Sequence, residues 1–310
     1  GDDVVLTPTF TDDDGLAAGV SHTATDTVTI PLDTPEGQYY VALMIDSGAA
    51  VDESDETNNL WWSSTADVQI VPPTGTIGGD VAGVISRDTV WNDTTQVYRL
   101  TGRVEVSEGA TLTITPGVRV ESSSPSYYID VLDEGTLNAE GATFASTRAT
   151  GHDHTILKYD DYSGDSQGTL TDVTFEASVS GAEPGLEIDE TDQVTVAGGT
   201  VLSLTIVRAA PTVENVNFPD ADPVYLRGTG VENFGAGNSF VGGAAFRASD
   251  EMSGSANRVW RPVGGMSRYV LDGWMQVEGG STTLNIEPGV RVESSSPSYY
   301  IDVLDEGTLN

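Results

Sequence analysis

Apolar and polar residues alternate in short runs over residues 80–310, and turn-forming residues separate these runs. In the stretch ATLTITPGVRVE, Leu112 and Ile114 alternate with threonines, and Val118 and Val120 alternate with arginine and glutamate. A period of two is typical of a strand with one buried face. A Pro-Gly pair between the two runs predicts a turn. The pattern therefore predicts two short strands joined by a tight corner, the unit from which a coiled β-solenoid is built.

Phenylalanines recur along the same region at intervals close to the length of a solenoid turn. Phe144, Phe175, Phe218 and Phe240 each follow a small or polar residue, at spacings of 31, 43 and 22 residues. The longest spacing fits two turns, the second being GGTVLSLTIV at 198–207. Repeats of about 20–50 residues are the signature of stacked turns. We therefore expect one continuous right-handed parallel β-helix with the phenylalanines inside it.

Residues 1–72 show a different pattern, that of an antiparallel sandwich. The segments expected to form strands are 22–33, 37–46 and 66–71. The acidic segment VDESDETNN at 51–59 predicts a turn, and the Pro/Gly-containing residues 73–80 predict a linker. The expected fold class is all-β, with a partial immunoglobulin-like β-sandwich followed by the β-helix over residues 81–310.

One segment of the chain occurs twice without change. PGVRVESSSPSYYIDVLDEGTLN occupies residues 116–138 and again residues 288–310, and similarity extends upstream to Trp91 and Trp260. A single recent duplication would explain the two copies, and so would a tandem array of blocks. An open solenoid turn exposes unpaired backbone and apolar faces. Because DEGTLN does not resemble a cap, we expect the coil to continue, in the same chain or into a neighbouring molecule.

The end of the sandwich region resembles the CARDB family, immunoglobulin-like modules of bacterial and archaeal surface proteins. That family closes with G-x-Y, a strand ending in aspartate, and an acidic E-S-x-E-x-N-N segment. The matching residues are Gly37, Tyr39, Asp46, Glu53, Ser54, Glu56, Asn58 and Asn59. The family's earlier strands are mostly missing here. The resemblance implies a spacer or adhesive module and no catalysis.

The solenoid region resembles right-handed parallel β-helices of the surface-protein type, with the pattern Y-x-v-x-G-x-v-x-V-x-x-G-a-t-L-x-I-x-P-G-v. The first block fits through Tyr98, Gly102, Val104, Val106, Gly109, Leu112, Ile114, Pro116 and Gly117. The second block fits through Tyr269, Gly273, Met275, Val277, Gly280, Leu284, Ile286, Pro288 and Gly289. The pattern is specific for an architecture and implies little about function.

The charge balance is extreme, with 48 acidic residues against 13 basic ones and a formal net charge of −35. Lys158 is the only lysine. Repulsion of this size destabilises a compact fold at low salt, whereas the Debye length of roughly 3 Å at ~1 M salt removes most of the penalty. We therefore expect a protein of a halophile. No basic stripe is present to bind nucleic acid, and no run approaches the ~20 apolar residues of a membrane span.

The absence of cysteine excludes disulfides and thiolate ligands, so any metal must bind through histidine and carboxylate side chains. In the polar cluster GHDHTILKYDDY, the candidate ligands of a divalent metal are His152, Asp153, His154 and Asp160. The run Asp12, Asp13 and Asp14 and the acidic segment 51–59 are candidate Ca²⁺ sites. Exposed loops of an acidic chain contain similar clusters. Ca²⁺ or other surface-bound cations are the only cofactors that the sequence suggests.

Enzymes built on β-helices include polysaccharide lyases and glycoside hydrolases. A hydrolase needs two carboxylates about 5–10 Å apart across a groove. The candidates for this pair are Asp130, Glu187, Asp189 and Asp192. A lyase would need a basic side chain beside Ca²⁺-binding carboxylates, and the candidates are Arg208 and Arg227. No catalytic motif is recognisable, so we assign no catalytic residue.

Several residues are candidates for surface roles. Asn92 begins the only glycosylation sequon, Asn-Asp-Thr. Trp61 and Trp62 follow the acidic turn, and in a sandwich we expect one of them to be buried and the other to make a contact between domains or subunits. Further candidate contact residues in the last turn of the coil are Tyr299, Tyr300 and Leu309.

Three functions are compatible with these features. The first is an extracellular structural or adhesive protein of a halophile, which self-associates into a surface fibre, filament or stalk. The second is a carbohydrate-active β-helix enzyme with a binding module in front of it. The third is a glycan- or host-binding spike. The repeated block and the lack of a catalytic motif favour the first.

Overall fold

A computed structural model of the chain describes residues 37–44, 57, 59–65, 68–70, 78–148, 154–160, 165–179, 184–253 and 256–310. The chain divides into two compact units, Gly1–Thr74 and Gly75–Asn310. Every regular element of the described residues is a β-strand, which confirms the all-β class. Within these residues no helix is long and apolar enough to cross a membrane.

The described part of the first unit consists of two antiparallel strand pairs. β1 (Gly37–Tyr39) pairs with β4 (Val68–Ile70), and β2 (Ala42–Met44) pairs with β3 (Leu60–Trp62). The strand expected at 37–46 is thus divided, because its two halves pair with different partners. Between them, the amide of Val41 donates to Ser63 Oγ at 3.0 Å. The expected strand at 22–33 lies outside the described residues.

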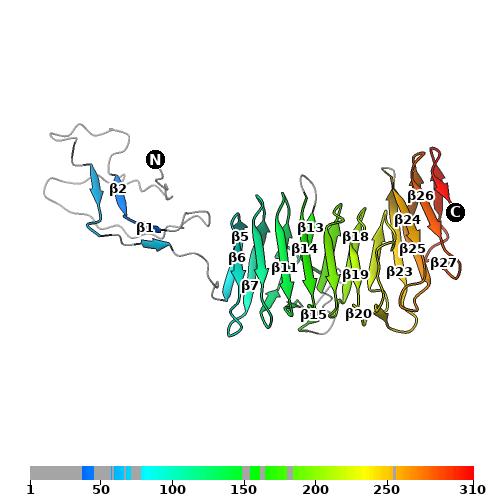
Figure 1. The fold of residues 1–310 in the computed structure, drawn as a ribbon, viewed down its shortest axis with the longest axis horizontal. Helices are drawn as coiled ribbons and strands as arrows, with labels where there is room; N and C mark the ends of the chain where they lie inside the picture. The colour runs from blue at the N-terminus through cyan, green and yellow to red at the C-terminus, as the bar shows by residue number, and fades with distance from the viewer. Residues whose placement is uncertain are drawn as a thin grey trace. The chain divides into compact units, whose positions relative to one another are not determined.

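The second unit is a parallel β-helix, as the alternation over residues 80–310 predicted. Figure 1 shows its strands stacked one after another from β5 to the last strands of the chain. The largest sheet contains β5 (Gly79–Ile85), β7 (Tyr98–Val106), β9 (Arg119–Ser122), β10 (Ile129–Val131), β12 (Thr143–Ser146), β13 (His154–Asp160), β15 (Thr174–Ala177), β16 (Pro184–Asp189), β18 (Ser203–Val207), β21 (Val224–Arg227), β23 (Phe246–Met252), β25 (Arg268–Glu278), β27 (Arg291–Ser294) and β28 (Ile301–Leu304).

Smaller parallel sheets complete the wall of the coil. One consists of β6 (Thr89–Trp91), β8 (Thr111–Ile114), β11 (Thr136–Glu140), β14 (Gln167–Thr171), β17 (Val194–Ala197) and β19 (Thr212–Glu214). The others are β20 (Asn217–Phe218) with β22 (Ser239–Phe240), and β24 (Asn257–Trp260) with β26 (Thr283–Ile286) and β29 (Thr308–Leu309). Parallel pairing of successive turns places equivalent side chains above one another.

The core is a set of inward rows, each formed by one residue from every turn. One row in register contains Val104, Ile129, Leu157, Leu186, Leu204, Val224, Phe246 and Tyr269. All of them are almost fully buried. The side chains expected inside are also buried: Leu112, Ile114, Val118, Val120, Phe144, Phe175 and Phe218. The inward positions predicted from the alternation are therefore confirmed.

The phenylalanine row is present and is interrupted where the sequence lacks a phenylalanine. The rings of Phe144 and Phe175 stack with centroids 5.1 Å apart, and those of Phe218 and Phe240 with centroids 4.9 Å apart. Thr200 forms isolated β-bridges to the turn before it and to the turn after it. The next residue, Val201, therefore occupies the position that a phenylalanine ring has in those turns. The long spacing thus spans two turns, as predicted.

The two copies of the repeated segment have the same local structure. Leu137 of the first copy pairs with Leu112 upstream of it, and Leu309 of the second copy pairs with Leu284 at the equivalent position. Upstream of each copy a tryptophan stacks on a tyrosine at an interplanar angle of 13°: Trp91 on Tyr98, and Trp260 on Tyr269. The block similarity read from the sequence is therefore a similarity of packing.

Candidate functional site

Two hollows lie on the outward face of the largest sheet, along one row of side chains. We call it the outward row, and it consists of Glu105, Asp130, Lys158, Glu187, Thr205, Tyr225 and Arg247, in register from β7 to β23. Side chains alternate between the two faces of a strand, so this row lies between the inward rows. The straight register of the coil positions these residues.

The first hollow has a volume of about 220 Å³ and surrounds the only lysine. It is lined by Pro125, Tyr128, Thr155, Lys158 and Glu187. The Lys158 ammonium lies 3.0 Å from Asp160, 3.2 Å from Glu187 and 3.8 Å from Asp189. Burial lowers the pKa of Lys158, but the hydrogen bonds and charges of Asp160 and Glu187 outweigh it and raise the pKa above its usual value. The lysine is therefore a fixed cation.

Asp130 lies next to this cluster and is only 3% exposed. Burial raises the pKa of Asp130, while the charge of Arg103, whose Nη2 lies 2.5 Å from Oδ2, lowers it in part. Oδ1 of Asp130 has no hydrogen-bond partner among the described residues. The carboxylate is thus held by a single arginine, and its ionised form is costly.

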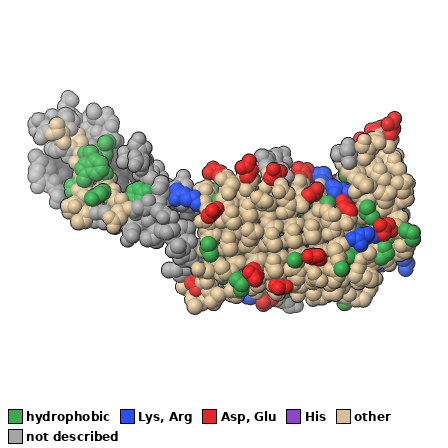
Figure 2. Space-filling view, viewed as in Figure 1, with side chains coloured by type: hydrophobic (Ala, Val, Ile, Leu, Met, Phe, Trp, Pro, Cys, Tyr) green, Lys and Arg blue, Asp and Glu red, His purple; other side chains and the backbone are tan. Residues whose placement is uncertain are grey.

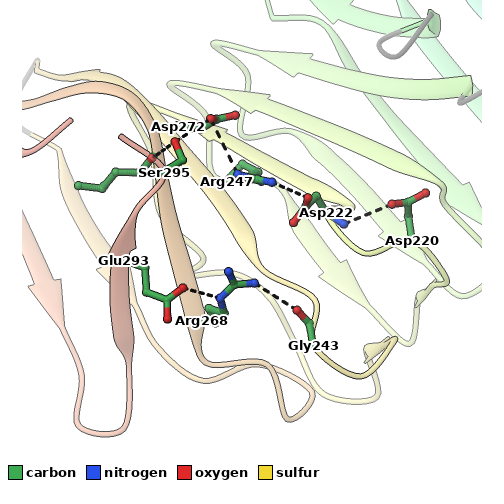
Figure 3. Close-up of polar contacts among 9 residues, drawn as sticks. Asp220, Asp222, Gly243, Arg247, Arg268, Asp272, Glu293 and Ser295 are labelled. Carbon is green, nitrogen blue, oxygen red and sulfur yellow. Dashed lines mark hydrogen bonds and ion pairs between the residues drawn. The ribbon is translucent and has the colours of Figure 1, made fainter. Parts of the chain in front are cut away.

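The second hollow has a volume of about 160 Å³ and lies further along the outward row. It is lined by Tyr225, Arg227, Arg247, Ala248, Ser249 and Asp272. Figure 3 shows Arg247 between two carboxylates: its Nη2 lies 2.6 Å from Asp222, and its Nη1 lies 3.8 Å from Asp272. In the same view Arg268 donates to Glu293 and to the carbonyl of Gly243.

The carboxylates considered for hydrolysis are partly brought together. Asp189 and Glu187 both face Lys158, with Asp130 one strand away, whereas Asp192 accepts a hydrogen bond from the amide of Ala210 elsewhere. Of the candidate bases, Arg208 pairs with Glu190 at 2.6 Å. The structure therefore gathers three of the four carboxylates, and it pairs each of these three with a cation.

The candidate metal ligands are mostly outside the described residues. His152, Asp153, Asp12, Asp13 and Asp14 lie there, as does nearly all of the segment 51–59. His154 begins β13, and Asp160 ends it with its carboxylate on Lys158. Within the part of the chain that the structure describes, no group of three or more His, Asp or Glu side chains is arranged to hold a metal ion.

The tryptophan pair differs from the expectation. Trp61 is 55% exposed and Trp62 is 57% exposed, so the prediction that one of them is buried is wrong. The reason lies in β3, a three-residue strand that pairs with β2 with all of its side chains exposed. Asn92 is exposed directly after β6, where its side chain is accessible to modification.

The contact candidates of the last turn are of two kinds. Tyr299 is partly buried against the core, whereas Tyr300 and Leu309 are exposed. The equivalent positions in the first copy of the repeat are covered by a further turn, as the valine of β27 and its counterpart show. Val292 is 37% exposed and its counterpart Val120 is fully buried, because β12 covers Val120.

The arginine partners of the outward row were not found from the sequence. Arg103 and Asp130 are 27 residues apart, and Asp222 and Arg247 are 25 residues apart. A spacing close to one turn is the only signal that could have indicated such pairs. It becomes usable only once the length of each turn is known.

Comparisons with known families agree with this architecture. Residues 3–61 match the family model CARDB, and residues 83–154 match the model of the pectate-lyase like beta helix domain. Searches of curated proteins and of solved structures found no match. The suspected combination of a CARDB module and a parallel β-helix is therefore confirmed. The chain is a β-helical protein with a surface-protein-like module in front.

Proposed function

We propose that this chain is part of an extracellular structural or adhesive protein of a halophile, which forms a repetitive surface fibre, filament or stalk. The observation that carries the proposal is the repeated block, whose two copies have the same local register and the same Trp–Tyr stack. Adding equivalent turns lengthens a solenoid without a new fold. A stalk or fibre requires this property, and a catalyst does not.

The inward side chains of the turn at 288–310 are compatible with self-association. Val303 is 40% exposed and Leu309 is 43% exposed, while their counterparts Val131 and Leu137 are fully buried under the following turn. Among the described residues, β27 and β29 pair on one side only. Unpaired strand edges and exposed apolar side chains are templates for another strand. A turn of the same kind, from the same chain or from a neighbouring molecule, would cover both.

The experiment is electron microscopy of the protein in molar salt, with size measurement alongside. We expect filaments or end-to-end assemblies whose contact buries more than about 1,000 Å². Leu309→Glu should abolish them, because it places a charge in the contact. Val241→Glu is the matched control, since Val241 is similarly exposed, at 45%, on another turn. Dispersed, compact monomers of the unmodified protein in molar salt would contradict the proposal.

A second candidate function is that of a carbohydrate-active enzyme or glycan-binding spike. It is favoured by the hollow at Lys158, because Tyr128 and Glu187 both line this cavity and its volume is large enough for part of a sugar ring. Release of reducing ends from a polysaccharide, lost in Glu187→Gln, would favour the enzyme. Binding without release would favour the spike.

A further inference from the structure

The hollow between β21 and β23 contains two arginines in a chain dominated by carboxylates. Arg227 is in register with Ser249, and Tyr225 with Arg247, so the two arginines are diagonal neighbours on adjacent strands. With strands about 4.8 Å apart and a rise of about 3.3 Å per residue, their Cα atoms are roughly 8 Å apart. Arg227 therefore brings a second guanidinium group to the hollow beside Arg247, whose charge is balanced in part by Asp222.

The two arginines differ in how they are held. Arg247 is fixed through its Nη2 by Asp222, and its Nη1 has only the 3.8 Å contact with Asp272, which is longer than a hydrogen bond. Arg227 is exposed, and its side chain makes no ion pair or hydrogen bond within the described residues. The hollow therefore presents one fixed and one unengaged guanidinium.

The surroundings match a small oxyanion. Arginine donates through a planar fork that fits the two oxygens of a carboxylate or sulfate. Tyr225 and Ser249 line the same cavity, whose volume of about 160 Å³ exceeds that of a single oxyanion group. Among the described residues, Asp272 is the one carboxylate that lines it, and Asp222 contacts Arg247 from outside this lining. A metal cation would be repelled by the two arginines.

We propose that this hollow is a binding site for an oxyanion group, a carboxylate or a sulfate, held between Arg227 and Arg247. Asp272 also lines the hollow, where its Oδ1 accepts a hydrogen bond from Ser295 Oγ at 3.1 Å. The site is independent of the fibre role, because neither arginine lies in the last turn of the coil. The net charge of −35 weakens anion binding at low salt, and molar salt screens this long-range repulsion.

The test is a titration followed by the backbone amide NMR signals of Arg227 and Ser249. Sodium sulfate, acetate, glucuronate and glucose are each added in molar sodium chloride at constant ionic strength. We expect sulfate, acetate and glucuronate to shift these signals with roughly millimolar affinity, and glucose to leave them in place. Tighter binding of glucuronate than of acetate identifies a saccharide carboxylate as the ligand, and equal binding identifies the bare oxyanion.

Variants separate the site from a general effect of charge. Arg227→Gln should weaken binding about tenfold, the value of one charge-assisted hydrogen bond, and Arg227→Lys should weaken it less. Arg99→Gln is the control, since it removes an exposed arginine of β7 and changes the net charge equally. Equal loss of affinity in Arg227→Gln and Arg99→Gln would overturn the proposal, and so would the absence of shifts with all three anions. The melting temperature of each variant verifies that it is folded.

Discussion

Identical side chains have different neighbours in the two copies of the repeated segment. Asp130 is buried beside Arg103. Asp130 is in register with Glu105, and Arg103 lies two residues before Glu105 on the same strand. The counterpart of Asp130 in the second copy is Asp302, which is in register with Gln276. Trp274, two residues before Gln276, occupies the position that Arg103 has in the first copy. Asp302 is only partly buried, so water solvates its charge. In the first copy, the carboxylate that a further turn covers is thus accompanied by an arginine.

This contrast predicts the effect of Arg103→Gln. The variant leaves the buried carboxylate of Asp130 without its cation, and we expect a loss of about 2 kcal/mol at pH 7, reduced from the value of a fully buried pair because Arg103 is partly exposed. The pKa of Asp130 is raised in the folded state, so protonation favours folding. The loss should therefore shrink as the pH falls through that pKa, and it should be smaller at pH 4 than at pH 7.

Chemical denaturation in molar salt measures these differences against the unmodified protein at each pH. Arg99→Gln, on the same strand, should cost almost nothing because Arg99 is exposed. An equal loss of unfolding free energy in the two variants would contradict this prediction. The same loss for Arg103→Gln at both pH values would also contradict it.

At the scale of the element, one turn of the coil is stable only when the next turn covers its inward row. Leu137 is fully buried because β14 follows β11, whereas Leu309 of β29 is 43% exposed. The two leucines have the same 21 residues before them in the repeated segment. Local sequence is thus held constant, and only the packing above the strand differs.

Leu137→Ala and Leu309→Ala form a matched pair for this point. We expect a loss of about 3 kcal/mol for Leu137→Ala, in the range for a buried leucine that leaves a cavity, and less than about 1 kcal/mol for Leu309→Ala. Urea unfolding of dilute, monomeric protein in molar salt gives both values. Equal losses would show that Leu309 is covered in solution.

At the scale of the whole molecule, repulsion among the acidic side chains is the main electrostatic feature. Figure 2 shows acidic side chains distributed along the visible face of the coil, without a single acidic patch. The cations are mostly engaged in ion pairs along the sheet, for example Arg258 with Glu232 at 2.7 Å and Arg119 with Glu176 at 3.0 Å. These pairs neutralise only a minority of the 48 acidic residues. The remaining repulsion acts over distances that salt screens.

We therefore predict strongly salt-dependent stability. The melting temperature should rise by at least about 10 °C between 0.1 M and 3 M sodium chloride, as screening removes several kcal/mol of repulsion. Thermal unfolding followed by circular dichroism measures it. Sucrose at the same osmolality is the control, since it favours the folded state by exclusion and does not screen charges. A melting temperature that is indifferent to sodium chloride would contradict the halophile interpretation.

Much of the coil was determined by the sequence alone. Alternation with a period of two decided which side chains of each strand lie inside, because successive residues of a strand face opposite sides. The spacing of the phenylalanines gave the turn length closely enough to locate the turn at 198–207. The repeated block predicted equivalent packing, and the tryptophan–tyrosine stacks confirm it. These features depend on local geometry, which the local sequence controls.

Only the tertiary structure decided which residues meet across turns. The pairing of Arg103 with Asp130, and the meeting of Arg227 with Arg247 in one hollow, depend on the register between strands about one turn apart. A change in the length of any loop would alter this register, so no local pattern reports it. The exposure of Trp61 and Trp62 was likewise missed, because burial depends on what packs above a strand. Leu137 and Leu309 show this most directly. Both lie in strands of identical sequence, and the presence of a neighbouring turn determines whether the side chain is buried.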